Sequence, residues 1–284
     1  MKLKRAAACI ASALAVIAPT TIVASGEASA APAGNIVTLG DSFTANPDQI
    51  LNAFQKTPIP NAVGYPNREG CLQAPNNWPR KLGVKTGAPI SDWSCTAQTS
   101  QTMLRRLDRA IAKGDVNKNT RSVVIAVGAN DYGGFGIAQG FHPWNPAKMR
   151  ADYVNNIKIA KAKIARHAPQ AKVVISGMIA MADPKPPHMF CAVNVIPNKP
   201  GGVPVPLLAT VERDNEGNQR AAANAIGASF VPMRMASAGN TPCAPDNNRF
   251  AAGVIDTTTP NYNMAFHPSD RGSEFIANKL KPVV

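Results

Sequence analysis

Histidine is scarce in this sequence, with four among 284 residues, so few side chains can act as a base near neutral pH. Acidic residues are also few, since 17 Asp and Glu stand against 30 Lys and Arg, for a formal charge of +13. The chain lacks zinc-finger spacing, an aromatic RNA-binding signature and a concentrated basic arm, so we expect no nucleic-acid partner. The positive charge suits acidic envelope polymers or lipid headgroups, or it simply keeps the protein soluble.

The first thirty residues have the pattern of a signal peptide. Basic residues at positions 2–5 precede an apolar stretch, and Ala28-Ser29-Ala30 supplies the small residues of a cleavage site. A membrane anchor is the alternative, but the apolar stretch is short and Pro19 interrupts it. No later stretch is long and apolar enough to span a bilayer. We therefore predict a signal peptide at 1–30, one domain at 31–284 and an extracellular protein without stable membrane insertion.

Four cysteines follow the predicted cleavage site. They are Cys71, Cys95, Cys191 and Cys243. An even number of cysteines in an exported chain predicts two disulfides, although four cysteines permit three pairings. A zinc site is the competing interpretation, and His188 with Cys191 is the one place to look for it. No second pair of ligands matches that spacing, so we predict no metal.

Short runs rich in β-branched residues alternate with helical patterns along the chain. The predicted strands are Ile36 to Leu39, Ser122 to Val127, Val173 to Ser176, Ser229 to Val231 and a weaker one near Ile90 to Trp93. Strands that alternate with helices of about ten to twenty residues indicate βαβ crossovers. The sequence therefore predicts a mainly parallel sheet that is covered on both faces.

Two stripes of apolar residues recur at helical spacing. They are Met103, Leu107 and Ile111, and then Met149, Tyr153, Ile157, Ala160 and Ile164. Asn145 and Pro146 are typical of a helix start, and Ser269 to Leu280 is a third helix candidate. Proline and glycine interrupt the pattern at 56–80 and 182–206, and each segment holds a cysteine, so we interpret both as surface loops held to the body.

The tripeptide Gly40-Asp41-Ser42 directly follows the first predicted strand. A serine hydroxyl is a poor nucleophile until a base takes its proton and donors stabilise the oxyanion. Ligands of parallel sheets collect at the carboxyl ends of the strands, where Ser42 would expose its side chain and leave its backbone N–H free. Asp41 and Ser42 could instead merely cap a helix.

A second strand end has the same design, because Ser122 to Val127 runs into Gly128-Ala129-Asn130-Asp131. The Asn130 amide there could donate to an oxyanion above Ser42, or Asn130 could be a turn residue. Among the histidines we prefer His267 as the base, because a helix candidate follows it and places it on a short loop at the edge of the sheet.

The other three histidines have weaker contexts. His142 lies in a loop rich in glycine and aromatic residues, where it could form a substrate wall. His167 ends a basic helix, where it would interact with the last carbonyls. We interpret His188 as a loop residue.

Taken together, these motifs resemble those of the SGNH (GDSL) hydrolase family. Gly40-Asp41-Ser42 resembles the first block of that family, Gly128-Ala129-Asn130-Asp131 its G-x-N-D block, and His267-Pro268 its last block. The resemblance implies a three-layer α/β/α sandwich with a mainly parallel, flavodoxin-like central sheet. It also implies a serine hydrolase that uses no metal and no organic cofactor. No G-x-S-x-G elbow occurs, because Gly40-Asp41-Ser42-Phe43-Thr44 lacks the closing glycine, which argues against the α/β-hydrolase alternative.

The sequence departs from this family at two positions. The family's second block has a glycine whose backbone N–H joins the oxyanion hole, and the matching residue here is Ala97. The triad acid usually lies three residues before the histidine, where this chain has Met264. The resemblance therefore implies a Ser42 and His267 dyad whose histidine a backbone carbonyl orients, although Asp270 or Asp256 could supply a carboxylate. The implied oxyanion donors are the N–H groups of Ser42 and Ala97 and the side chain of Asn130.

Cys71, Asn77-Trp78-Pro79 and Ser94-Cys95 resemble the secreted lipase and esterase branch of the family. That branch supports pairing of Cys71 with Cys95 and of Cys191 with Cys243. The implied function is hydrolysis of an acyl ester, carried by a lipid or by an acylated envelope glycan, through an acyl-enzyme in a monomeric protein. Transfer of the acyl group to another alcohol by the same nucleophile is an alternative, and so is an envelope-binding protein that kept the scaffold and lost activity.

Overall fold

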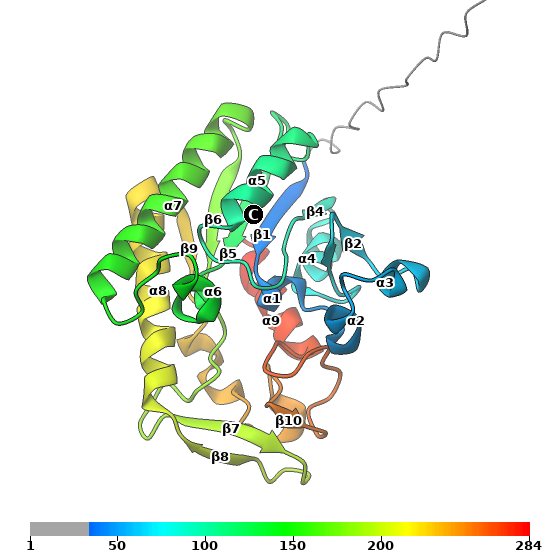
Figure 1. Ribbon diagram of the computed structural model, residues 1–284, viewed down its shortest axis with the longest axis vertical. Helices are drawn as coiled ribbons and strands as arrows, with labels where there is room; N and C mark the ends of the chain where they lie inside the picture. The colour runs from blue at the N-terminus through cyan, green and yellow to red at the C-terminus, as the bar shows by residue number, and fades with distance from the viewer. Residues whose placement is uncertain (1–33) are drawn as a thin grey trace, which may run out of the picture.

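The computed structural model describes residues 34–284, so the predicted signal peptide lies outside the described residues. Its centre is a five-stranded sheet in the order β4-β1-β5-β6-β9 (Figure 1). The strands are β1 (Ile36–Gly40), β4 (Ile90–Asp92), β5 (Ser122–Ala126), β6 (Lys172–Ser176) and β9 (Ser229–Val231). All neighbouring pairs are parallel. This order is the flavodoxin-like one, in which the first strand lies between the second and third, so the predicted sheet is confirmed.

The strands form where the sequence concentrates β-branched residues, and all five predicted runs are strands. Both faces of the sheet are covered, so the central strands β1, β5 and β6 are mostly apolar, whereas the edge strand β4 carries the polar residues Ser91 and Asp92. Every residue of β1 is buried. Neighbouring side chains then point to opposite faces, with Val37 in one core and Ile36 in the other.

Helices cover the sheet on both sides, which confirms the predicted three layers. One face packs against α5 (Met103–Ala112), α7 (Pro146–His167) and α8 (Pro206–Ile226). The other face packs against α4 (Trp78–Thr86) and α9 (Asp270–Leu280). Figure 1 shows α5, α7 and α8 on the near and left side of the sheet and α9 behind it.

Two of these helices begin as the sequence predicts. Asn145 Oδ1 accepts a hydrogen bond of 3.1 Å from the backbone N–H of Lys148, and Pro146 is the first residue of α7. Ser269 Oγ accepts a hydrogen bond of 3.2 Å from the N–H of Gly272 at the start of α9. Both caps satisfy backbone donors that the first turn of a helix leaves without partners.

The interpretation of 56–80 and 182–206 as loops is wrong in part. The second segment forms an antiparallel hairpin of β7 (Met189–Asn194) and β8 (Gly201–Pro204), and β7 also pairs with β10 (Ile255–Asp256). The hairpin tolerates proline because β8 is the edge strand of this second sheet. The first segment holds three short elements before α4: α3 (Ile59–Ala62), β2 (Asn67–Arg68) and β3 (Cys71–Leu72).

Both segments are joined to the rest of the fold by disulfides, as predicted. Cys71 pairs with Cys95 and Cys191 with Cys243. Each bridge closes a loop whose cross-link stabilises a fold by about 3 to 4 kcal/mol in the chain-entropy model. Because Cys191 is oxidised to a disulfide, its sulfur is not free to bind zinc beside His188.

The remaining elements are short and lie mostly in the connections after strands. They are α1 (Ser42–Ala45), α2 (Gln49–Ala53), α6 (Gly134–Ile137) and the 3-10 helices at Ala129–Tyr132, Met235–Asn240 and Asp246–Asn248. Within residues 34–284, no helix combines the length and the apolar composition that a bilayer crossing requires.

Candidate active site

Ser42 is the first residue of α1, directly beyond the carboxyl end of β1. The side chain of Asp41 caps this helix, because its Oδ1 accepts a hydrogen bond of 2.9 Å from the N–H of Phe43. A β carbon on Gly40 would lie 2.1 Å from Thr44 Oγ1, so the tight turn requires glycine at that position. Among the described residues, the backbone N–H of Ser42 has no acceptor, and it is therefore free for a ligand.

His267 lies on the loop before α9 and is held by its own loop. Its Nδ1 is 2.8 Å from the carbonyl oxygen of Ala265. Its Nε2 is buried and has no hydrogen-bond partner within the described residues. The ring stacks against Phe43, the residue after Ser42, with ring centroids 4.7 Å apart. Because a carbonyl only accepts hydrogen bonds, the neutral ring carries its proton on Nδ1 and presents a lone pair at Nε2.

The residue before His267 has a strained backbone. Phe266 has a φ of 62°, in the left-handed region that costs a residue with a β carbon about 1 to 2 kcal/mol. Its backbone N–H donates a hydrogen bond of 2.9 Å to Gly253, and its ring packs edge-on against Phe190 at 5.4 Å. Packing and hydrogen bonding therefore hold a conformation that sequence alone does not favour, next to the candidate base.

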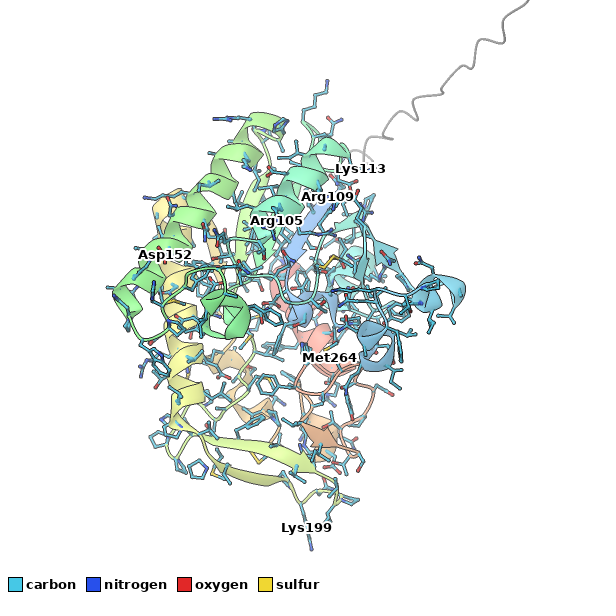
Figure 2. All side chains as sticks on the ribbon, in the orientation of Figure 1. Arg105, Arg109, Lys113, Asp152, Lys199 and Met264 are labelled. Atoms are coloured by element: carbon cyan, nitrogen blue, oxygen red, sulfur yellow. A yellow bond between two sulfur atoms is a disulfide. The ribbon has the colours of Figure 1, made fainter. Side chains whose placement is uncertain are left out.

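No carboxylate contacts the His267 ring in the described chain. Met264, at the position where the family usually has its acid, is half-buried on the loop beside α2 (Figure 2). The N–H of the next residue, Ala265, donates a hydrogen bond of 2.9 Å to Gln49 Oε1 and holds this loop against α2. Asp270 lies 2.8 Å from Lys81 Nζ instead. The contact of Nδ1 with a backbone carbonyl is thus the one orienting hydrogen bond that the ring makes.

Asp256 is also engaged away from the histidine. Its carboxylate accepts hydrogen bonds from the N–H of Gly253 at 2.7 Å and from the N–H and hydroxyl of Thr259 at 2.8 and 2.7 Å. Burial raises the pKa of Asp256, but these hydrogen bonds outweigh it and leave the pKa below its ordinary value. Asp256 therefore organises the loop from 253 to 259.

Ser42, Asn130 and His267 line one cavity of about 200 Å³. These residues come from three segments, and the sequence separates the first from the last by more than two hundred residues. The apolar part of the wall consists of Phe43, Met178, Met181, Leu208, Val211 and Phe266. The Ser42 hydroxyl makes no hydrogen bond to Nε2, which is common before a substrate tightens such a site.

The loop after β5 is linked to the loop after β4 by two neighbouring side chains. Asn130 Nδ2 donates a hydrogen bond of 3.0 Å to the carbonyl of Gln98. The buried carboxylate of Asp131 accepts hydrogen bonds from the N–H and hydroxyl of Ser100, at 2.8 and 2.6 Å. Burial raises the pKa of Asp131 to about 6, although the Ser100 hydrogen bonds lower it. The sequence identified Asn130 but assigned no role to Asp131.

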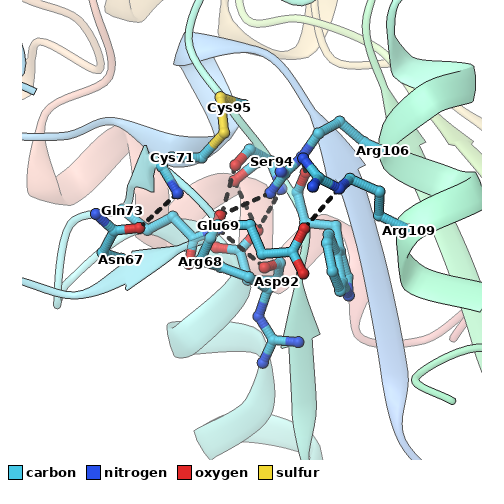
Figure 3. Close-up of a disulfide and its surroundings, with 12 residues drawn as sticks. Asn67, Arg68, Glu69, Cys71, Gln73, Asp92, Ser94, Cys95, Arg106 and Arg109 are labelled. Atoms are coloured by element: carbon cyan, nitrogen blue, oxygen red, sulfur yellow. Dashed lines mark hydrogen bonds and ion pairs between the residues drawn. A yellow bond between two sulfur atoms is a disulfide. The ribbon is translucent and has the colours of Figure 1, made fainter. Parts of the chain in front are cut away.

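Ala97 lies on the loop after β4 and does not line the cavity. Its φ is 62°, in the left-handed region that favours glycine, and its N–H has no acceptor among the described residues. The loop is fixed on one side by the disulfide from Cys71 to Cys95 (Figure 3). Gln73 Nε2 donates hydrogen bonds to the carbonyls of Asp92 and Ser94, at 2.9 and 3.1 Å.

The other histidines lie away from this cavity. His142 is exposed in a surface hollow beside Trp144, His167 is the exposed last residue of α7, and His188 Nδ1 is 3.0 Å from the carbonyl of Asp183. The preference for His267 over His142 therefore agrees with the position of the cavity. Among residues 34–284, no group of three or more His, Cys, Asp or Glu side chains could hold a metal ion.

Two further polar residues line the cavity that sequence reasoning missed. Glu212 and Asn215 come from α8, a helix that the apolar pattern did not predict. Its buried face carries Glu212, Asn215, Asn218 and Gln219, where a helix against a sheet usually carries apolar side chains. The burial of these polar residues becomes visible only in the structure, so the apolar pattern gave no signal for this helix.

Comparisons with known proteins show the family and the fold of the chain. A model of the GDSL-like lipase/acylhydrolase family matches residues 38–275. The structure resembles an extracellular lipase from Streptomyces rimosus, with a TM-score of 0.59 and 18% identity over 89% of this chain and 100% of that chain. It also resembles phospholipase A1 from Streptomyces albidoflavus, with a TM-score of 0.55 and 16% identity over 89% and 100% of the two chains.

A third structure of similar fold is LAE5, an α/β hydrolase enzyme from the metagenome of Lake Arreo. Its TM-score is 0.51 and its identity 14%, over 91% of this chain and 97% of that chain. No curated protein matches the chain in sequence. At these identities the solved structures support the fold.

We predict that His267 stays neutral well into the acid range. Burial lowers the pKa of His267 to about 4 from an ordinary 6.5, and the hydrogen bond to Ala265 offsets burial only in part. A ¹³C-histidine NMR titration, assigned with His267→Gln, should show the midpoint near pH 4. A midpoint at pH 6 or above would contradict the burial of Nε2.

The linked change in stability has a defined sign. Between about pH 6.5 and 4 the unfolded chain binds the proton at His267 more readily than the folded chain, so the free energy of unfolding falls as pH falls. Burial raises the pKa of Asp41 and of Glu212 to about 7, and these groups act in the opposite sense over an overlapping range. The resolved imidazole titration is therefore the measurement that checks the prediction.

We also predict that Ala97→Gly stabilises the protein. Relief of the left-handed conformation is worth about 1 to 2 kcal/mol, and the greater freedom of glycine in the unfolded chain offsets about 0.5 to 1 kcal/mol. Urea unfolding should show a net gain of about 0.5 to 1 kcal/mol. Ala151→Gly, at an exposed position inside α7, is the matched control and should lose about 1 kcal/mol. Equal losses in both variants would show that the φ of Ala97 carries no strain.

Proposed function

The chain belongs to the GDSL-like lipase/acylhydrolase family and is a carboxylic ester hydrolase, and from this premise we propose that Ser42 and His267 cleave the ester through an acyl-enzyme. The orientation of His267 carries this proposal. Its Nδ1 is engaged by the carbonyl of Ala265, so the lone pair of the neutral ring is at Nε2, which is buried, unpartnered and on the wall of the cavity that Ser42 shares. A lone pair placed in this way can accept the serine proton.

The proposed reaction has two steps. In the first, Ser42 Oγ attacks the carbonyl carbon of the ester, its proton passes to His267 Nε2, and the protonated imidazole then gives that proton to the leaving alcohol. In the second, water attacks the acyl-enzyme, His267 takes the water proton, and Ser42 recovers it as the carboxylic acid leaves. Both steps begin with a neutral His267. Because burial lowers its pKa to about 4, the ring is neutral at neutral pH and available as the base.

Three donors would hold the oxyanion during both steps. The N–H groups of Ser42 and Ala97 have no acceptor among the described residues. Asn130 Nδ2 carries two hydrogens, of which one bonds to Gln98, so the other remains for the substrate. The links from Asn130 and Asp131 to the loop at 98–100 support a fixed distance between the donors, which is what preorganised stabilisation requires.

We further propose that the enzyme is exported. The two disulfides support this localisation, since such bridges persist in oxidising compartments. The predicted signal peptide at 1–30 would direct the export.

A fluorophosphonate probe tests the nucleophile. It should label the native protein once, and Ser42→Ala should lose all labelling together with ester hydrolysis. Ser229→Ala, an exposed serine of β9, is the control and should label like the native protein. Intact-mass spectrometry reports the adduct. Persistent labelling of Ser42→Ala would place the nucleophile elsewhere, and an unlabelled native protein would favour a scaffold without activity.

Asn130→Ala tests the oxyanion donor. We expect kcat to fall by about 100- to 1000-fold, because one such donor is worth about 2.7 to 4 kcal/mol in the transition state. The lost hydrogen bond to Gln98 should cost only about 1 kcal/mol of stability, so the variant should remain folded by circular dichroism. A variant that turns over as fast as the native enzyme would remove Asn130 from the site.

A further inference from the structure

Glu212 is a buried carboxyl group that the hydrolytic mechanism does not use. It lies on α8 with 4% of its surface exposed, on the wall of the cavity that holds Ser42 and His267. Its Oε1 accepts hydrogen bonds from the N–H groups of Met181 and Ala182, at 2.9 and 3.2 Å. Its Oε2 is buried and has no partner among the described residues.

Anchoring the loop after β6 accounts for only half of this carboxyl group. Oε1 alone binds Met181 and Ala182, and an amide oxygen would do the same. Within residues 34–284 no basic side chain forms an ion pair with Glu212 either. The charge of Arg234 lowers the pKa of Glu212, but Arg234 Nε lies 2.7 Å from Glu216 Oε2, one turn further along α8. Native proteins rarely leave a buried carboxyl oxygen without a partner, so Oε2 indicates a group that arrives with the ligand.

A second unpartnered oxygen lies on the same wall. Asn215, three residues after Glu212, is 2% exposed and lines the cavity, and its Oδ1 is also buried with no partner in the part of the chain that the structure describes. Residues three apart lie on one face of a helix, so both groups address one side of the cavity. Apart from these two residues and the proposed reacting residues Ser42, Asn130 and His267, the wall is apolar.

We propose that Glu212 and Asn215 form a hydroxyl-binding subsite, so that the part of the substrate in this cavity is hydroxylated and is not a plain alkyl chain. The inference rests on the proposed function, because Ser42 supplies the reacting group. The hydroxyl can belong to the alcohol of the ester, as in a polyol or sugar ester, or to its acyl group. In either case the carbon skeleton packs on the apolar residues of the wall, and the hydroxyl meets Glu212 and Asn215.

A hydroxyl fits this site better than an amine or a carbonyl does. Burial raises the pKa of Glu212 to about 7, although the N–H groups of Ala182 and Met181 lower it, so both protonation states occur near neutral pH. An ammonium group would pair only with the ionised form and a carbonyl only with the protonated form. A hydroxyl both donates and accepts, and it can therefore pair with either form.

Three esters with the same carbon skeleton test the subsite. Propyl butyrate is the reference, glycerol monobutyrate adds hydroxyls to the alcohol, and propyl 3-hydroxybutyrate adds one to the acyl group. The native enzyme should prefer one of the hydroxylated esters by about tenfold to a hundredfold in kcat/KM, since a polar site rejects a substrate that lacks the matching group. The ester that is preferred identifies which side of the substrate enters the cavity.

Variants then assign the preference to Glu212. Glu212→Met should reduce it to within about threefold, whereas Glu212→Gln, which keeps an acceptor for Met181 and Ala182 and presents an amide to the hydroxyl, should retain most of it. Glu216→Gln, a glutamate of the same helix outside the cavity, is the control and should keep the native ratio. Asn215→Leu, which leaves the loop contacts of Glu212 intact, serves if Glu212→Met does not fold. A native preference that survives in both apolar variants overturns the proposal, and so does a native enzyme with no preference for either ester.

Binding to Ser42→Ala separates this proposal from the proposed hydrolysis. By calorimetry, Ser42→Ala should bind one hydroxylated ester at least about tenfold more tightly than propyl butyrate, and the added Glu212→Met or Asn215→Leu substitution should remove the difference. If the native protein hydrolyses none of the three esters but Ser42→Ala shows this binding pattern, the catalytic proposal is refuted and the subsite is supported. If the native protein hydrolyses them but Ser42→Ala shows no difference in binding, the subsite alone is refuted.

Discussion

The buried carboxylate of Asp131 fixes the geometry of the site, because it joins two loops that the sheet itself leaves separate. Parallel strands hold one another by their backbones, but the loops beyond their carboxyl ends share no ladder. Asp131 bridges that gap with two hydrogen bonds to Ser100, and Asn130 adds a third from the neighbouring position to Gln98. These hydrogen bonds therefore link the loop that holds Ala97 directly to the loop that holds Asn130.

The histidine side of the site is held in a different way. His267 depends on contacts within its own loop and on the ring of Phe43, while Phe266 keeps a left-handed backbone next to it. The Gly253 carbonyl and the ring of Phe190 hold that conformation in place. One half of the site thus relies on bonds between loops and the other on a strained turn that packing supports.

The sequence predicts the sheet and the convergence of the site because both follow from local patterns. Buried parallel strands are short β-branched runs, and their carboxyl ends meet at one edge, so Ser42 and Asn130 fall together once the strands are recognised. His267 followed from its place before a helix. Ala97 was identified from family resemblance, and neither its left-handed φ nor its place outside the cavity wall is readable from composition.

What the sequence did not predict depends on contacts between distant residues. Helix α8 was not predicted because its inward face carries Glu212 and Asn215, and the periodicity of apolar residues does not detect a polar buried face. The hairpin of β7 and β8 was not predicted because proline and glycine usually mark loops. Strand β8 can contain them because it lies at the edge of the second sheet. The cavity wall combines the unpredicted helix α8 with the loops after the predicted strands and the loop of His267.

The carbonyl that orients the imidazole has a genetic consequence. A carboxylate in that role would be a side chain, and one nucleotide change could delete it. Ala265 contributes a backbone oxygen, which every amino acid at that position would also supply. Substitutions at Ala265 that keep the shape of the loop should therefore leave the orientation and tautomer of the His267 ring unchanged.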